Sequence, residues 1–143
     1  MGKKVWFRAF VERLLMAEFD TQELVVDVDG DVPFHSGSAA CWVSIETRSV
    51  MAVRVWGIAA EGIRPTAAAL REVNDLNQRA GLAKVALVGG RVVVELRLPA
   101  DQVSGRSVSR ACGHVVGLAD EVGVLFAAVF GGSTPYPVAV EAG

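Results

Sequence analysis

Two adjacent glycines between alternating apolar runs constrain the fold of this chain more than any other feature. Gly89 and Gly90 separate residues 83–88 from residues 91–98, and both of these runs alternate in character. A two-residue connection between strands needs positive φ at both turn positions, which glycine adopts without steric cost. The pattern therefore predicts a tight β-hairpin over residues 83–98.

The register of this hairpin separates apolar from charged side chains. Pairing Val88 with Arg91 across the turn places branched aliphatic residues on one face, namely Val85, Leu87, Val92 and Val94. Charged residues share the other face, with Lys84 opposite Glu95 and with Arg91 and Arg97 nearby. Such a sheet contacts water on one side, so we expect one layer of strands that helices cover on the other.

Helical spacing of apolar residues predicts two helices in the first part of the chain. The first spans residues 4–18, with Trp6 on its apolar face. The second begins at Thr66, carries Leu70 on its buried stripe and ends at Gly81.

A third helix follows the hairpin. Either Ser104 or Ser107 caps its start, and residues 130–132 end it. Three glycines interrupt it, namely Gly113, Gly117 and Gly123. Each costs about 1 kcal/mol in helix propensity, so we expect close approach to the sheet or to a second subunit at these positions.

Four strands are expected between the first two helices, over residues 24–28, 32–35, 40–47 and 50–59. Burying the aliphatic residues of the last two leaves a mixed set on the outer face: Trp42, Glu46, Arg54 and Trp56. This arrangement requires an odd-numbered loop around Arg48, because a two-residue loop would turn one strand over.

The two tryptophans are the main candidates for a binding surface. Outward-facing tryptophans on a sheet are usually covered by a helix, a second subunit or a ligand. Trp42, Arg54 and Trp56 are therefore candidate partner-binding residues. The alternative is that the third helix or the C-terminal tail simply buries both rings.

The composition bounds the class of protein. With 143 residues, of which 52% are hydrophobic, we expect one domain over residues 1–132 and an extended tail over residues 133–143. The 14 basic and 16 acidic residues are evenly spread, so no basic stripe predicts nucleic-acid binding. The longest uncharged apolar run, residues 122–130, is too short to span a bilayer, and we expect a cytoplasmic protein that does not bind membranes.

No set of residues has the spacing of a catalytic or metal site. Cys41 and His35 lack an orienting partner. Cys112 and His114 point to nearly opposite faces of a helix, and further ligands of matching type are missing. Residues 27–31 alternate aspartates but lack the continuation of a calcium loop. We expect reduced, buried thiols, no metal, no cofactor and no enzymatic activity.

Several short motifs resemble one protein family. They are Val28-Asp29-Gly30-Asp31, Val53-Arg54-Val55, Ile63-Arg64-Pro65, Val73-Asn74-Asp75-Leu76-Asn77, Val92-Val93-Val94-Glu95-Leu96, Leu98-Pro99, Ala119-Asp120-Glu121 and Phe130-Gly131-Gly132. Over residues 24–132 they resemble the actinobacterial branch of the YbjN family, whose fold is similar to that of type III secretion chaperones. The glycine-rich third helix and the Pro-Tyr-Pro tail depart from the family pattern.

The resemblance implies an α+β fold, with a single antiparallel sheet flanked by helices in the order α-β-β-β-α-β-β-α. It also implies a non-enzymatic chaperone or regulatory adaptor that binds a peptide or protein client and forms a homodimer. Asn74 and Asn77, one turn apart on the second helix, are further candidates for partner contact, with solvent exposure or capping as the alternative.

A small-ligand sensor domain is the other function considered, with Trp42, Arg54 and Trp56 forming its pocket. A pocket enclosed within the monomer would favour the sensor. An open groove or an uncovered sheet edge would favour the adaptor, because an extended peptide can lie in either.

Overall fold

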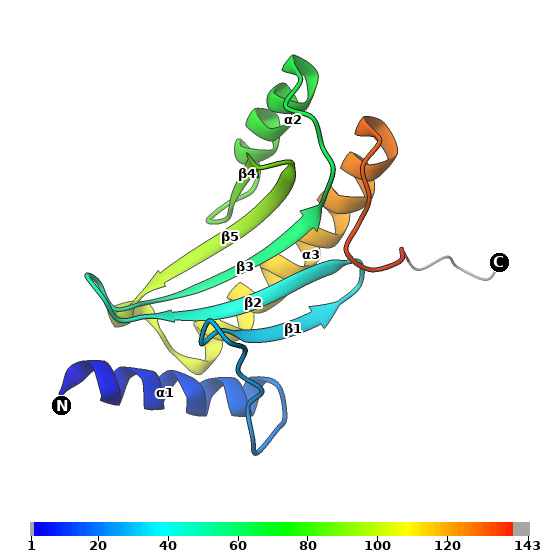
Figure 1. Ribbon diagram of the computed structural model, residues 1–143. Coiled ribbons are helices and arrows are strands. Elements are labelled where there is room, and N and C mark those ends of the chain that lie inside the picture. The colour runs from blue at the N-terminus through cyan, green and yellow to red at the C-terminus, as the bar shows by residue number, and fades with distance from the viewer. Residues whose placement is uncertain (1, 139–143) are drawn as a thin grey trace.

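The computed structural model describes residues 2–138 (Figure 1). Its elements are α1 (Lys3–Glu18), β1 (Val32–Ser36), β2 (Ala39–Glu46), β3 (Ala52–Ala60), α2 (Ala67–Asn77), β4 (Lys84–Val88), β5 (Arg91–Pro99), the 3-10 helix η1 (Ala100–Gln102) and α3 (Gly105–Phe130). Apart from the short η1, this order confirms the predicted α-β-β-β-α-β-β-α arrangement.

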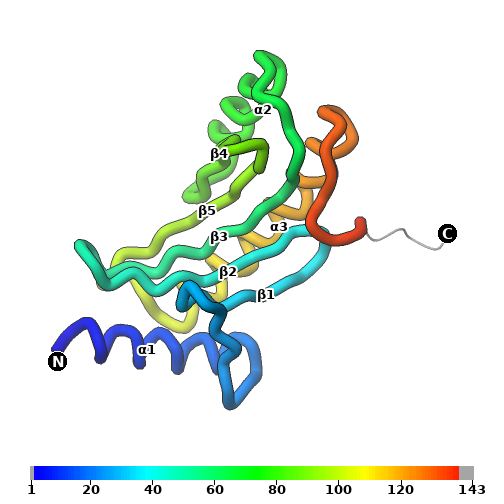
Figure 2. Tube along the Cα trace, viewed as in Figure 1, coloured from blue at the N-terminus to red at the C-terminus, as the bar shows by residue number. Residues whose placement is uncertain are grey.

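All the strands form one antiparallel sheet, in the order β1-β2-β3-β5-β4. The second strand of the hairpin, β5, pairs with β3, and β4 therefore becomes an edge. The other edge is β1. Helix α2 connects β3 to β4 and packs against β4, as the tube in Figure 2 shows.

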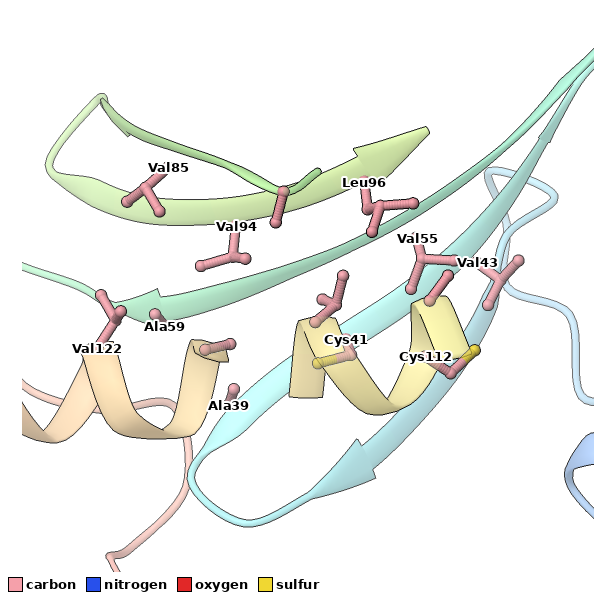
Figure 3. Packing of buried hydrophobic residues seen from close by; sticks show 14 of the residues in the cluster. Ala39, Cys41, Val43, Val55, Ala59, Val85, Val94, Leu96, Cys112 and Val122 are labelled. Atoms are coloured by element: carbon pink, nitrogen blue, oxygen red, sulfur yellow. The ribbon is translucent and has the colours of Figure 1, made fainter. Parts of the chain in front are cut away.

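Helices α3 and α1 cover one face of the sheet, which we call the inner face. Helix α3 packs across β3, β5 and β2, and α1 packs beside α3. Cys41, Val43 and Val55 of the strands belong to the same buried cluster as Cys112 and Val122 of α3 (Figure 3). Residues at the alternate positions of each strand point to the opposite face, which we call the outer face.

The hairpin has the predicted register. Val88 pairs with Arg91, and Lys84 pairs with Glu95. Gly89 and Gly90 have φ values of 57° and 79°, in the left-handed region that glycine adopts most easily. The loop between β2 and β3 is also as predicted, since residues 47–51 are odd in number and Glu46 pairs with Ala52.

The predicted strand over residues 24–28 is wrong. The segment pairs with no strand, and the side chain of Val28 is 100% exposed. Asp27 provides the reason, because its Oδ1 accepts hydrogen bonds from the backbone nitrogens of Asp29 (3.0 Å) and Asp31 (2.9 Å). An aspartate bound to the backbone two residues further on stabilises a turn, so the chain reverses here before β1 begins.

Two residues predicted on buried stripes are exposed instead. Trp6 is 66% exposed and Leu70 is 49% exposed. The buried stripe of α1 is narrower than its apolar face and consists of Phe7, Val11 and Leu15. The ring of Trp6 stacks on Phe10, with centroids 5.3 Å apart, and faces solvent.

Helix α3 begins as one of the two alternatives predicts. Ser104 is the N-cap, and its side chain accepts a hydrogen bond from the backbone nitrogen of Ser107 (3.1 Å). The Ser107 hydroxyl in turn accepts one from the backbone nitrogen of Ser104 (2.8 Å). This reciprocal capping box satisfies two backbone donors that the first turn would otherwise leave unpaired.

The three glycines of α3 differ in their surroundings. A Cβ atom at Gly123 would lie 2.2 Å from the carbonyl oxygen of Ala59, so the helix contacts β3 through this glycine. A Cβ at Gly113 or Gly117 would meet no atom within 4 Å. Close approach to the sheet is therefore confirmed at Gly123 alone.

By length and composition, α3 is apolar enough to cross a membrane, with a mean hydropathy of 1.6. Its buried residues nevertheless recur at helical spacing and contact the sheet, among them Val108, Val115, Val122 and Phe126. One face of α3 thus belongs to the core, while only 28% of its apolar window is buried, and a single helix of this kind is weak evidence for a membrane span.

The described part of the tail is docked on the domain. Glu61 and Ser133 exchange two backbone hydrogen bonds of 2.8 and 3.0 Å. The backbone nitrogen of Tyr136 donates to the carbonyl of Ser38 (3.0 Å), and the Tyr136 ring lies 3.7 Å from that of His35. The rest of the predicted tail, residues 139–143, lies outside the described residues.

Candidate functional site

The outer face of the sheet carries the two tryptophans side by side. Trp42 on β2 pairs directly with Trp56 on β3, and their rings stack with centroids 4.6 Å apart and an interplanar angle of 23°. A pair in this geometry contributes about 0.5–1.5 kcal/mol beyond the area it buries. The predicted outer-face position of both rings is confirmed by the burial of their neighbours on the inner face, such as Val43 and Val55.

Polar contacts hold the Trp56 ring in place. Its Nε1 donates a hydrogen bond to Ser44 Oγ at 2.9 Å. The guanidinium carbon of Arg54 lies 4.7 Å from the ring centroid, and Arg54 Nε lies 2.5 Å from Glu95 Oε2. Because Glu95 pairs with Trp56 across the β3–β5 ladder, the ion pair keeps the guanidinium above the ring. The structure therefore brings Trp42, Trp56 and Arg54 together, as the sequence predicts.

A second ion pair bounds this surface toward the β2–β3 loop. Arg97 donates to both carboxylate oxygens of Glu46, at 2.8 and 3.2 Å. Both side chains are partly exposed, so this pair adds little to stability and mainly fixes two long side chains in one position. The tryptophan pair is thus an aromatic surface with charged residues beside it.

No helix of the described chain packs over this aromatic surface. The two helices of the inner face lie on the opposite side of the sheet, and α2 packs at the β4 edge. In the tail, the Tyr136 ring packs against His35 of β1 at an interplanar angle of 33° and does not stack on either tryptophan. Within residues 2–138, therefore, neither the third helix nor the tail stacks on the two rings.

A groove of about 580 Å³ adjoins Trp56 on the outer face. Its walls come from β3, β4, β5 and α2, and include Trp56, Val93, Ala86, Val88 and Lys84. Several of these side chains are exposed, Val88 by 61%, so the groove is open to solvent along β4. Sequence reasoning missed Val93, Ala86 and Val88 as members of the site, although the hairpin pattern already placed their strands in one sheet.

Asn77 lines this groove together with Trp56, but its side-chain amide is already hydrogen-bonded within the chain. Its side-chain amide donates to the carbonyl oxygen of Val85 (2.8 Å), and its Oδ1 accepts from the backbone nitrogen of the same residue (2.8 Å). Asn77 therefore takes the place of a neighbouring strand at the β4 edge. Asn74, one turn earlier, is exposed and does not line the groove.

The geometry gives no support to a nucleophilic pair. His35 pairs with Ala40 and Phe34 pairs with Cys41, so the His35 and Cys41 side chains lie on opposite faces of the sheet. Burial raises the pKa of Cys41 to about 11. Burial, with smaller effects of Glu18 and Cys41, raises the pKa of Cys112 to about 12. Thiols with such pKa values hold almost no reactive thiolate near neutral pH.

The remaining metal-ligand candidates are also accounted for. His114 donates from Nε2 to the carbonyl oxygen of Ala80 at 2.9 Å. Both cysteines are free and buried. Within the part of the chain that the structure describes, no three His, Cys, Asp or Glu side chains lie close enough together to hold a metal ion.

Comparison with known proteins identifies a family and a fold. The family model TY-Chap1, described as "T3SS (YopN, CesT) and YbjN peptide-binding chaperone 1", matches residues 6–138. No curated protein has a similar sequence.

Two solved structures have a similar fold. One is that of the HopA1-SchA chaperone-effector complex, with a TM-score of 0.64 and 13% identity over 82% of this chain and 93% of the other. The second is that of the ExsC-ExsE complex, with a TM-score of 0.65 and 10% identity over 85% of this chain and 94% of the other. At these identities the similarity establishes the shared α+β fold.

Proposed function

Because the chain belongs to the TY-Chap1 family of T3SS and YbjN peptide-binding chaperones, we propose that it is a non-enzymatic chaperone or regulatory adaptor that holds a peptide segment of a client protein. The first of the two solved structures supports this proposal, since it contains a chaperone in complex with an effector. We expect a member of the YbjN branch rather than a dedicated secretion chaperone. An actinobacterial origin, a cytoplasmic location and a homodimer are our further expectations.

One observation carries the proposal: a stacked tryptophan pair on a sheet face over which no described helix packs. Aromatic residues in such positions dominate the energetics of protein interfaces, because they bury a large area at a small entropic cost. Large apolar side chains of the client would rest on Trp42 and Trp56 and enter the adjoining groove. Arg54, already held over Trp56, would stay in place during binding and therefore cost little further ordering.

The shape of the groove favours a peptide over a small molecule. Its wall along β4 is open, with Lys84 and Ala86 exposed, whereas ligand pockets bury most of the surface of a small ligand. An extended segment can occupy an open groove and continue beyond it in both directions. We therefore favour the adaptor over the sensor domain.

The edges of the sheet limit how a client strand could join it. At the β4 edge, both backbone groups of Val85 are already bound to Asn77. At the β1 edge, residues 32–36 have backbone hydrogen bonds to β2 and to no other described segment. We therefore favour strand addition at β1, next to Trp42, which pairs with Pro33 of that strand, although Pro33 itself has no backbone N–H to donate.

The test compares two tryptophan variants of the full chain. The wild-type protein and the Trp56→Ala variant are used to capture clients from the native organism, with identification by mass spectrometry. The affinity of the captured client is then measured by calorimetry, and Trp56→Ala should lose ~2 kcal/mol or more of binding free energy. Trp6→Ala is the matched control, because Trp6 is an exposed tryptophan on α1, away from the outer face.

Thermal unfolding of the same variants separates binding from folding. We expect Trp56→Ala to stay folded with a moderately lower unfolding temperature, because it loses the stacking on Trp42 and the hydrogen bond to Ser44, while its client binding is strongly weakened. A Trp56→Ala protein that is strongly destabilised yet binds its client normally would contradict the proposal and would assign Trp56 a purely structural role. Trp56→Phe, which keeps an aromatic ring, should recover most of the affinity.

A further inference from the structure

A second cavity lies at the border of the inner face, on the side of the sheet opposite the aromatic surface. It measures about 490 Å³ and lies between the C-terminal half of β5, the loop before β4 and the first turns of α3. Leu96 and Leu98 form its floor and are buried, whereas Leu82 on the loop is 83% exposed. A large exposed leucine beside an apolar cavity is the kind of surface that a second chain covers.

The charged residues of this cavity are all cationic. Arg106 and Arg110 of α3 line it, and no aspartate or glutamate does. Both arginines are exposed, and neither forms an ion pair with any residue in the described range 2–138. In a chain with a formal net charge of −2, two arginines without an acidic partner beside an apolar floor form a local cationic site.

The start of α3 does not provide the charge of this site. Ser104 and Ser107 bind each other's backbone nitrogens in the capping box. His114 at the other end of the cavity donates to Ala80. The two guanidinium groups are therefore the groups free to bind an anion.

We propose that this cavity binds an acidic segment of a partner protein that inserts an apolar side chain against Leu82, Leu96 and Leu98 and places carboxylates on Arg106 and Arg110. The two arginines are four residues apart, so they lie one turn apart on the same face of α3. This spacing matches two carboxylates of one peptide better than the single carboxylate of a fatty acid. Guanidinium groups bind carboxylates through two parallel hydrogen bonds, which adds geometric selectivity.

The site is independent of the aromatic surface of the outer face. Its residues come from α3, β5 and the loop before β4, and none of them lines the groove beside Trp56. A test of this proposal is therefore independent of whether the proposed function is correct.

The test uses a peptide of stated composition and the full chain. Fluorescein-labelled Glu-Glu-Leu-Phe-Glu-Glu is titrated with the protein by fluorescence anisotropy, at low and at physiological ionic strength. We expect binding that is at least about tenfold weaker for the peptide with glutamine in place of every glutamate. Decanoate, an aliphatic chain with one carboxylate, should not compete at similar concentration.

Protein variants locate the binding. Arg106→Glu with Arg110→Glu should weaken binding of the acidic peptide at least about tenfold, and Leu82→Ala should weaken it severalfold. The matched control is Arg64→Glu with Arg71→Glu, which changes the net charge equally at exposed arginines outside the cavity. Trp6→Ala, at an exposed tryptophan that lines neither the cavity nor the groove beside Trp56, should leave peptide binding unchanged, and circular dichroism checks that every variant is folded.

Several results would overturn the proposal. Equal losses of peptide affinity in the cavity variant and the control variant would show that net charge alone attracts the peptide. Equal affinity for the glutamine peptide and the glutamate peptide would show that carboxylates are not recognised. Competition by decanoate would assign the cavity to a small aliphatic acid. A dimer that Arg106→Glu with Arg110→Glu dissociates in sedimentation velocity would make a second copy of this chain the occupant.

Discussion

The side chain of Asn77 binds both backbone groups of Val85, so one amide on α2 replaces a missing neighbour strand at the β4 edge. Exposed strand edges are templates for pairing with other chains, and proteins protect them in various ways. Here the protection comes from a helix that packs against the same edge. The contact also ties the end of α2 to the wall of the groove beside Trp56.

Replacing Asn77 by alanine should therefore uncover the β4 edge. We expect a loss of about 1–2 kcal/mol in the free energy of unfolding, because two hydrogen bonds to Val85 disappear while water satisfies its backbone groups only in part. Urea unfolding measures the loss, and size-exclusion chromatography detects new association through the edge. Asn77→Asp, which keeps the acceptor and lacks the amide donor, should be intermediate. Wild-type stability in Asn77→Ala would show that the amide contact contributes nothing.

The glycines of α3 should respond to alanine in opposite directions. Gly123→Ala should lower the free energy of unfolding by about 1–3 kcal/mol, because the new Cβ would overlap the carbonyl oxygen of Ala59. Gly113→Ala and Gly117→Ala should raise it by about 0.5–1 kcal/mol each, since the added methyl meets open space and alanine favours the helix. Thermal melts of the three variants provide the comparison. A stabilising Gly123→Ala substitution would contradict the observed contact of α3 with β3.

Asp120 should make the stability of the domain depend on pH in the acid range. The hydroxyl and the backbone nitrogen of Ser38 both donate to Asp120 Oδ1, at 2.6 and 2.8 Å, and these hydrogen bonds lower the pKa of the carboxyl. A carboxyl group whose pKa is lower in the folded than in the unfolded chain stabilises the folded state at pH values above its unfolded-state pKa of about 4. This stabilisation is lost as the pH falls through the lower pKa of the folded state.

The measurement is urea unfolding at a series of pH values from neutral to acid. Asp120→Asn can still accept from Ser38 but does not titrate, so the loss of stability on acidification should be smaller in this variant than in the wild type. Parallel pH profiles for the two proteins would show that Asp120 does not contribute to acid sensitivity.

Both thiols should be unreactive in the folded protein. Burial raises the pKa of Cys41 to about 11 and of Cys112 to about 12, so neither forms appreciable thiolate at neutral pH. We expect slow reaction with a thiol-specific chromogenic reagent in buffer and rapid reaction of both thiols in denaturant. Replacing Cys41, Cys112, His35 and His114 together should leave client binding intact, apart from a loss of ~1–3 kcal/mol in stability from cavities. Loss of cellular function in a folded variant that still binds its client would contradict the non-enzymatic role.

Much of the fold could be predicted because the deciding interactions are local. The glycine pair at residues 89–90 sets the hairpin register through its own backbone conformation. The capping serine of α3 acts on a backbone donor three residues away. Alternation along β2 and β3 fixes which side of its own strand each tryptophan takes, and the odd-numbered loop of residues 47–51 puts Trp42 and Trp56 on the same face. The same reasoning was wrong for residues 24–28, because an apolar run of a few residues also precedes turns, and for Trp6 and Leu70, which helical spacing placed on buried stripes.

The rest depended on contacts between residues far apart in the chain. The order β1-β2-β3-β5-β4 placed Glu95 opposite Trp56 and so made the ion pair that holds Arg54 over the ring. The same packing left Trp6 exposed, bound Asn77 to the β4 edge, and brought Leu82 of one loop and Arg110 of α3 to the same cavity. The sequence by itself determined which residues alternate, turn and cap, because those choices depend on neighbours within a few positions. The tertiary structure alone decided which faces meet, because that choice follows from packing the entire core at once.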